Sequence, residues 1–120
     1  MQEVRFTIQG VPRTKKNSTW RTKQGHQMPS LAYKQWETAA LIQLGRAGHL
    51  GIKFAKPMNC KAIFYREAFR GDAVGYYQAL ADALEKAQVV VNDKWIVSWD
   101  GSRLEKDADN PRVDFELTEA

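Results

Sequence analysis

Hydrophobic residues along this chain change their spacing from every second position to every third or fourth position and back again, and this order constrains the fold strongly. A period of two is typical of a strand with one buried face, and a period of 3.6 is typical of a helix with one buried face. The order is strand, helix, strand, helix, strand, strand. It predicts an α+β domain in which two helices cover one mixed sheet of about four strands. A chain of 120 residues has enough surface to bury one core, so we expect a single domain over residues 1–120.

The first half of the chain is expected to hold one strand, a long loop and one helix. Residues 4–9 alternate between apolar and polar side chains and predict a strand. Residues 13–28 are basic, polar and aperiodic, which predicts an exposed loop. Ser30 can cap a following helix of about 15 residues. The apolar positions of that helix are Tyr33, Trp36, Ala40, Leu44 and Ala47.

The second half predicts three strands and a helix. Residues 58–65 alternate in a way that suits a strand covered on both faces, and residues 76–87 carry the apolar stripe of a second helix. The β-branched residues 89–91 are compatible with a short additional strand. We expect a third strand over residues 95–99 and a final strand over residues 113–117.

The two halves of the chain carry opposite charge. Residues 1–53 contain nine lysines and arginines and two acidic residues, whereas residues 54–120 contain nine lysines and arginines and twelve acidic residues. Basic side chains bind polyanions by displacing condensed counterions, and clustered carboxylates near phosphate need a metal cation between them. A metal-dependent nuclease requires both features. Scattered surface charge explains the same counts, so charge alone leaves both interpretations open.

Cysteine content and hydropathy exclude several other classes. Cys60 is the only cysteine, so it cannot form a disulfide within the chain, and a thiolate zinc site would lack its second sulfur. We expect a buried structural thiol at this position. No apolar run approaches the roughly 20 residues that a membrane helix needs. We therefore expect the protein to be cytoplasmic and to have no membrane partner.

Several carboxylates are candidates for phosphodiester chemistry. Hydrolysis of a phosphodiester needs an activated water and a stabilised leaving oxygen, and hard cations held by carboxylates supply both. Three of the candidates stand in turn-like segments, where acids are common for structural reasons alone, and the fourth suits a solvated helix position. The histidines and the cysteine stand in no recognisable nucleophile motif. The candidate catalytic residues are Asp72, Asp93, Asp100 and Asp82.

Three segments of the chain carry a resemblance to a known family. They read, in order, GVPRTKKNS after the first strand, then PSLAYKQWE, then GDAVGYYQALADALEKAQVVVNDKWIVSW. Over nearly the whole chain they resemble the RusA family of Holliday-junction resolvases, which carries Asp-x-Asp-Asn, an Asp-Ala-Leu helix and Asp-Asp in this order. The resemblance implies a homodimeric endodeoxyribonuclease that resolves four-way DNA junctions by paired phosphodiester hydrolysis in recombination and repair. It also implies magnesium held by aspartates, with manganese as a substitute.

The resemblance assigns two catalytic positions and departs from the family at three others. Asp72 matches the family's first catalytic aspartate, and Asp93 matches the catalytic aspartate before the following strand. The family's second aspartate falls on Val74, the asparagine that follows it falls on Gly75, and a lysine that the family often carries on its second helix falls on Gln78. The site is therefore either rearranged or inactive.

If the site is rearranged, another carboxylate has to replace the missing ligand. The resemblance places Asp72 and Asp93 in the metal site, and either Asp100 or Asp82 can complete it. We prefer Asp100, because it follows Asp93 along the next strand in an unusually polar segment. Asp82 has the better match to the family but the more structural position.

The basic loop after the first strand is the expected DNA contact. Lys15, Lys16 and Asn17 match a polar loop of the family that would grip backbone phosphates. Trp20 either stacks on an unpaired base at the branch point or folds back on the protein. Trp95, like Trp36, falls on an apolar stripe and is expected in the core. Further residues expected near DNA are Arg13, Arg21, Lys23, Arg70 and Lys106.

Two other functions compete with the junction endonuclease. A branched-DNA-binding protein would keep the basic loop without a working metal site, and the valine at position 74 suits it. A small RNA-binding module would account for only one feature of the sequence, the basic loop with its tryptophan. The effect of divalent cations distinguishes the endonuclease from the branched-DNA-binding protein. Competition by linear RNA distinguishes it from the RNA-binding module.

Overall fold

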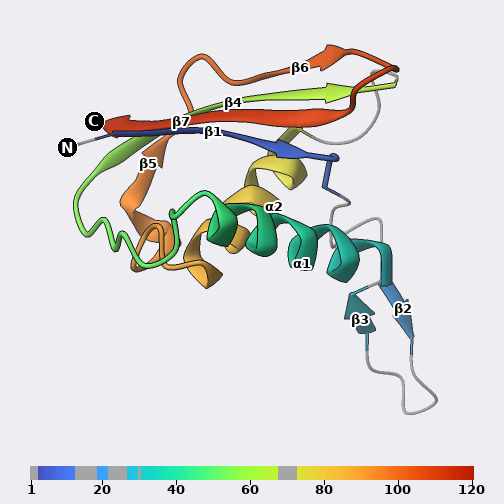
Figure 1. Cartoon of the computed structure of the whole chain (residues 1–120), viewed down its shortest axis with the longest axis horizontal. Helices are drawn as coiled ribbons and strands as arrows, with labels where there is room; N and C mark the ends of the chain where they lie inside the picture. The colour runs from blue at the N-terminus through green and yellow to red at the C-terminus, as the bar shows by residue number, and fades with distance from the viewer. Residues whose placement is uncertain (1–2, 13–18, 22–26, 30, 68–72) are drawn as a thin grey trace.

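The computed structural model describes residues 3–12, 19–21, 27–29, 31–67 and 73–120. They form an α+β fold in which two helices lie on one face of a five-stranded sheet (Figure 1). In chain order the elements are β1 Glu3–Gln9, β2 Thr19–Arg21, β3 Gln27–Pro29, α1 Leu31–Arg46, β4 Met58–Arg66, α2 Ala73–Lys86, the 3-10 helix η1 Asp93–Trp95, β5 Ile96–Ser98, β6 Arg103–Lys106 and β7 Arg112–Glu119.

The sheet is mixed, as the sequence predicts. β7 lies between β1 and β4 and is antiparallel to both. β5 and β6 share the other edge of β4 and run parallel to it, β5 beside the start of β4 and β6 beside its end. β6 is a strand that the sequence does not predict. Three of its four residues are charged and Leu104 is its single apolar residue, so only its pairing with β4 reveals it.

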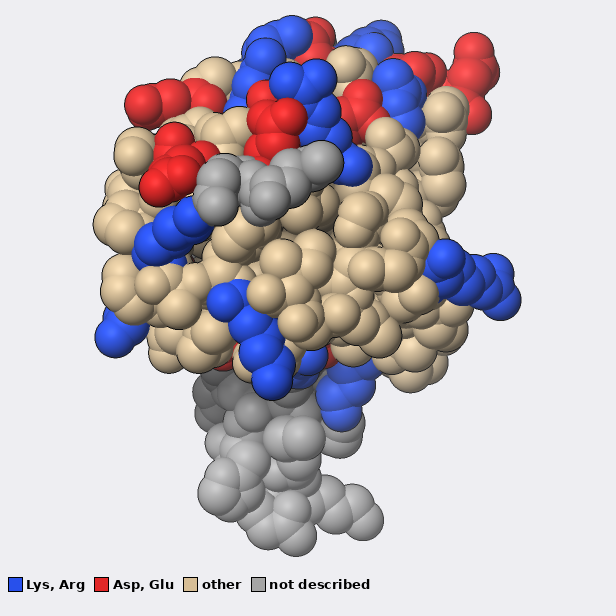
Figure 2. Space-filling model, turned by 60° about the vertical axis from the view of Figure 1, so that its left-hand side comes forward, with Lys and Arg blue, Asp and Glu red and all other residues tan. Residues whose placement is uncertain are grey.

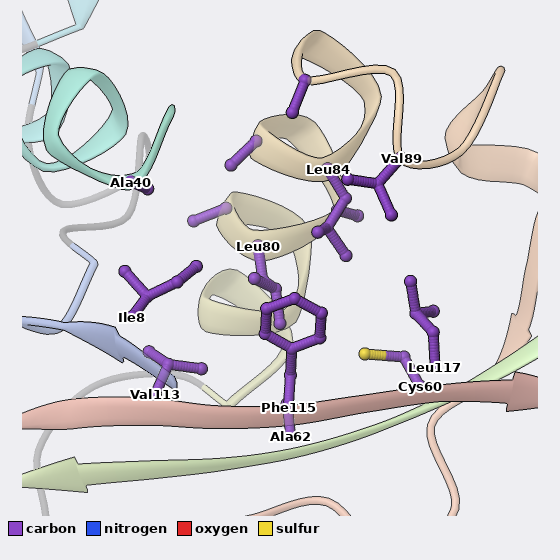
Figure 3. Packing of buried hydrophobic residues seen from close by; sticks show 14 of the residues in the cluster. Ile8, Ala40, Cys60, Ala62, Leu80, Leu84, Val89, Val113, Phe115 and Leu117 are labelled. Carbon is purple, nitrogen blue, oxygen red and sulfur yellow. The ribbon is translucent and has the colours of Figure 1, made fainter. Parts of the chain in front are cut away.

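The core lies between the sheet and the two helices. Alternate residues of the three long strands face the helices, because successive side chains of a strand point to opposite faces. Figure 3 shows Ile8, Val113 and Phe115 from the sheet facing Leu80 and Leu84 from α2. The thiol of Cys60 belongs to this cluster and is fully buried, which confirms the expected structural cysteine.

Both helices end in the same hydrogen-bonded motif. In α1 the amide of His49 donates to Leu44 O at 2.9 Å, and in α2 the amide of Val89 donates to Leu84 O at 2.9 Å. Such a bond across six residues requires a left-handed residue after the helix. Gly48 takes this conformation in α1 with φ 78°, and Gln88 takes it in α2 with φ 54°. The motif after α2 turns the chain back toward η1.

Three details differ from the sequence-based expectations. Within residues 13–28, which were expected to be a loop, β2 and β3 pair as antiparallel strands. α2 begins at Ala73, three residues before the first position of its apolar stripe. Trp95 is not in the core, because it lies in η1 and not in a strand, so the two-residue alternation does not apply to it. Trp36 is buried as expected.

Among the described residues, no helix covers the opposite face of the sheet, and most side chains there are polar. Arg5 and Glu116 form an ion pair at 3.4 Å across β1 and β7, and Thr7 donates a hydrogen bond to Asp114 at 2.7 Å. Figure 2 shows acidic and basic side chains intermixed on the upper part of the molecule, above a surface with few charges. None of the helices in the described part of the chain is long and apolar enough to cross a membrane.

Candidate functional site

A hollow between α2 and the η1–β5 segment brings together positions that are distant in the sequence. Val74 and Gln78 of α2 line it together with Asp93 of η1. Val74 and Gln78 are one helical turn apart, so their side chains lie on the same face of α2. The hollow has a volume of about 370 Å³. The other described residues that line it are Tyr77, Ala81, Ile96 and Trp99.

Hydrogen bonds hold Asp93 against α2. The amide of Asp93 donates to Glu85 Oε1 at 2.8 Å, so the backbone of η1 is tied to the helix. Asn92 caps η1, and its side chain accepts a hydrogen bond of 2.9 Å from the amide of Lys94. Both bonds use backbone amides, and Asp93 itself is exposed. Its carboxylate is therefore available to a ligand.

Asp82 faces α1 and takes part in helix packing. The hydroxyl of Tyr33 donates to Asp82 Oδ2 at 3.3 Å. One turn further along both helices, Lys86 and Glu37 form an ion pair at 2.6 Å. Burial raises the pKa of Tyr33 above its ordinary value, and the negative charges of Asp82 and Glu37 raise it further. Asp82 is thus part of an interhelical contact and does not line the hollow.

Asp100 lies in the turn that joins β5 to β6. Its amide donates to Asn59 Oδ1 at 2.9 Å, and the side-chain amide of Asn59 donates back to Asp100 O at 3.3 Å. Gly101 follows with φ 86°, a left-handed conformation that suits a tight turn. Asp93 precedes β5 and Asp100 follows it, so the two acids stand at opposite ends of this strand.

The metal site suggested by the sequence is not complete among the described residues. They contain no group of three or more histidine, cysteine or acidic side chains that could hold a metal ion. In the hollow, Asp93 is the one carboxylate among the described lining residues. Asp72 lies outside the described residues, directly before Ala73 at the start of α2.

Comparisons with known proteins add no assignment to this geometry. No model of a known protein family matches the chain, and no curated protein is significantly similar to it. The hollow and its lining residues are therefore the structural basis for assigning a function to this chain.

The DNA-binding candidates are only partly described. Trp20 and Arg21 lie in β2, which pairs with β3 and not with the main sheet. Lys106 ends β6, is exposed and stands opposite Arg66 of β4. Both cations are therefore at the end of β4 from which the chain continues toward α2. Arg13, Lys15, Lys16, Asn17, Lys23 and Arg70 lie outside the described residues.

Two aromatic residues of the hollow were not singled out from the sequence. The rings of Tyr77 and Trp99 stack at 4.9 Å between centroids with an interplanar angle of 10°. Tyr77 follows Tyr76, which the periodic stripe assigns to the core, and Tyr77 itself lies off that stripe. The signal that could have found Tyr77 is a second stripe of α2, formed by Val74, Tyr77 and Ala81 at helical spacing.

Proposed function

We propose that this chain is a magnesium-dependent endonuclease that acts on branched DNA. The observation that carries the proposal is the shared hollow of Val74, Gln78 and Asp93. In the resemblance to the RusA family these positions correspond to the second aspartate, the lysine and the later catalytic aspartate. Two segments far apart in the chain thus meet at the positions where that resemblance puts the chemistry.

The proposed metal ligands are Asp72 and Asp93. Magnesium in proteins is commonly held by one or two carboxylates and keeps several of its water ligands. Two aspartates are therefore a sufficient set even though position 74 carries a valine. A bound cation would activate a water and stabilise the leaving oxygen, and manganese suits the same oxygen ligands.

The remaining parts of the proposal concern DNA and symmetry. The excess of lysine and arginine in residues 1–53 supports binding to a polyanion, with Lys15 and Lys16 as the main phosphate contacts. Resolution of a four-way junction requires two opposed cuts. A homodimer provides two equivalent sites related by a two-fold axis, which suits such a substrate.

A second candidate is a branched-DNA-binding protein that does not cut. The hollow favours it through the uncharged side chains of Val74 and Gln78, which leave Asp93 as the one described carboxylate there. Such a protein would recognise the junction through its basic residues alone. Binding is common to both candidates, so only cleavage separates them.

The deciding experiment measures cleavage of an end-labelled four-way junction and of a matched linear duplex, with magnesium or with EDTA. We expect magnesium-dependent nicks confined to the junction, and a loss of about 100-fold or more in Asp93→Asn, because a metal ligand is removed. Asp109→Asn is the matched control, since Asp109 is exposed in the turn between β6 and β7 and does not line the hollow.

Each other outcome points to a different conclusion. Junction binding without cleavage in magnesium or manganese would reject the endonuclease and favour the binding protein. Equal cleavage by Asp93→Asn and the wild type would reject the proposed site. Displacement of the junction by linear RNA at lower concentration than by linear DNA would favour an RNA-binding module.

A further inference from the structure

A row of aromatic rings leads from the core to the hollow. Phe64 of β4 stacks with Tyr76 at 5.5 Å and lies against Tyr77 at 5.8 Å, and Tyr77 stacks with Trp99 at 4.9 Å. Phe64 and Tyr76 are buried, whereas Tyr77 and Trp99 are half-buried and line the hollow. Phe64 thus supports Tyr77, and Tyr77 in turn supports Trp99, the outermost ring of the row. A preorganised pair of rings at a hollow loses little conformational freedom when a flat ligand stacks on it.

The hollow combines these rings with two polar groups. Val74, Ala81 and Ile96 add apolar surface to its wall. Gln78 contributes an amide that can both donate and accept hydrogen bonds, and Asp93 contributes a carboxylate. The volume of about 370 Å³ is at the low end of the range of roughly 300–1,000 Å³ for ligand pockets. A small planar group with apolar faces and a polar edge matches this lining.

We propose that the hollow is a nucleobase subsite, in which an unpaired base of the bound DNA strand stacks on the Tyr77–Trp99 pair and presents its edge to Gln78. The inference rests on the proposed function, since branched DNA supplies the base. Bases at a branch point can leave the stack more easily than bases inside a duplex. Stacking on aromatic side chains is tolerant of sequence because every base has a π-face.

The same subsite gives a physical role to the departures from the RusA pattern at positions 74 and 78. An aspartate at position 74 and a lysine at position 78 would put opposite charges into the wall of the hollow. Val74 and Gln78 leave this wall uncharged, so the face of a base can enter without desolvating a charge. Among the described lining residues, Asp93 remains as the charged group, and it is the part shared with the proposed metal site.

The experiment is a double-mutant cycle on junction binding in EDTA, where no cleavage occurs. The change in the DNA is an abasic nucleotide next to the branch point, placed on each strand in turn. The change in the protein is Trp99→Leu. Loss of one stacked base is expected to weaken binding about 5- to 100-fold. If the base stacks on Trp99, Trp99→Leu should weaken binding to the intact junction by a similar factor and have little further effect on the abasic junction.

Two further variants control for the fold and for tryptophan as such. Trp99→Phe keeps an aromatic ring and should retain most of the affinity. Trp95→Leu removes a neighbouring tryptophan that does not line the hollow, so it should bind both junctions like the wild type. Thermal melting reports whether each variant folds. If Trp99→Leu does not fold, photocrosslinking of wild-type protein to 5-iododeoxyuridine at the branch point replaces it, with the cross-link expected on Trp99 or Tyr77.

The outcomes separate this inference from the proposed function. Additive effects of the two changes, or a cross-link outside the Tyr77–Trp99 pair, would overturn the base subsite even if magnesium-dependent cleavage is found. Coupled effects without cleavage in magnesium would support the subsite in a branched-DNA-binding protein. Absence of any junction binding would reject both.

Discussion

Val74 is 67% exposed and therefore contributes little to the core. It stands in the first turn of α2, two residues after Asp72 in the sequence, and lines the hollow with Asp93. A single exposed apolar side chain is common on protein surfaces, so the interest of Val74 lies in its position at the hollow. A metal-dependent nuclease would favour a carboxylate at position 74, whereas a protein that only binds DNA would not require one.

Val74→Asp is expected to strengthen metal binding. A third carboxylate near Asp72 and Asp93 raises the charge of the site, and an acid in the first turn of a helix is favoured by the helix dipole. We expect about tenfold tighter magnesium binding, which adds about 1.4 kcal/mol of stability at saturating magnesium. Thermal melting with and without magnesium measures this change.

The control for this substitution is Val97→Asp. Val97 is 55% exposed on β5 and does not line the hollow. The difference in melting temperature between Val97→Asp and the wild type should therefore be the same in magnesium as in EDTA. The same magnesium response in both variants, or none in Val74→Asp, would contradict a metal site at this hollow.

Among the elements, α2 connects the core to the hollow. Its core face carries Leu80 and Leu84, and its stripe of Val74, Tyr77 and Ala81 faces η1 and β5. Two contacts with α1 fix the orientation of α2 about its own axis. They are the Tyr33–Asp82 hydrogen bond and the Glu37–Lys86 ion pair. These contacts lie one helical turn apart on both helices, so together they resist rotation about the helix axis.

Tyr33→Phe tests the first of these contacts through the pH dependence of stability. Burial and the nearby Asp82 and Glu37 raise the pKa of Tyr33 in the folded state, whereas the unfolded value is about 10. The unfolded chain therefore loses this proton first. The stability from neutral Tyr33 is fully present below about pH 10 and is lost as the pH rises above it.

We expect the free energy of unfolding of the wild type to fall above about pH 10, and to fall less steeply in Tyr33→Phe. At neutral pH the variant should be less stable by about 1 kcal/mol, because a partly buried hydrogen bond is lost. Urea unfolding at pH 7 and at several values above pH 9 measures both effects. Curves that stay parallel across this range would show that Tyr33 ionises alike in both states.

For the whole molecule, the main feature is the unequal distribution of charge along the chain. Residues 1–53 carry a net positive charge and residues 54–120 a net negative charge, and the outer face of the sheet balances acids and bases in local pairs such as Arg5–Glu116. Paired charges add little long-range field, whereas an unbalanced basic segment attracts a polyanion. DNA binding should therefore depend on the first half of the chain.

Lys15→Gln combined with Lys16→Gln is expected to weaken junction binding and reduce its salt dependence. Each phosphate contact contributes about one unit to the slope of log affinity against log salt concentration, so the slope should decrease by about two. Lys56→Gln is the control, since Lys56 pairs with Glu119 at 3.6 Å in the second half of the chain. An unchanged slope in the double variant would exclude these lysines from the DNA contact.

The sequence by itself determined the elements whose formation depends on one buried face. β1, β4, β7, α1 and α2 all contain a periodic apolar pattern, and the α+β class follows from their order. Cys60 and Trp36 were placed in the core for the same reason, because their neighbours at the strand or helix period are apolar. Such patterns are local and need no knowledge of the partner element.

Only the tertiary structure decided which segments meet. β6 and the β2–β3 pair form because a second strand satisfies their backbone groups, and their side chains carry no apolar period. Trp95 and Trp99 are both aromatic and four residues apart, yet only Trp99 lines the hollow. The difference arises because η1 interrupts the strand alternation and the turn after α2 brings the η1–β5 segment back along the helix. Contacts between distant segments of this kind depend on the packed fold and leave no periodic trace in the sequence.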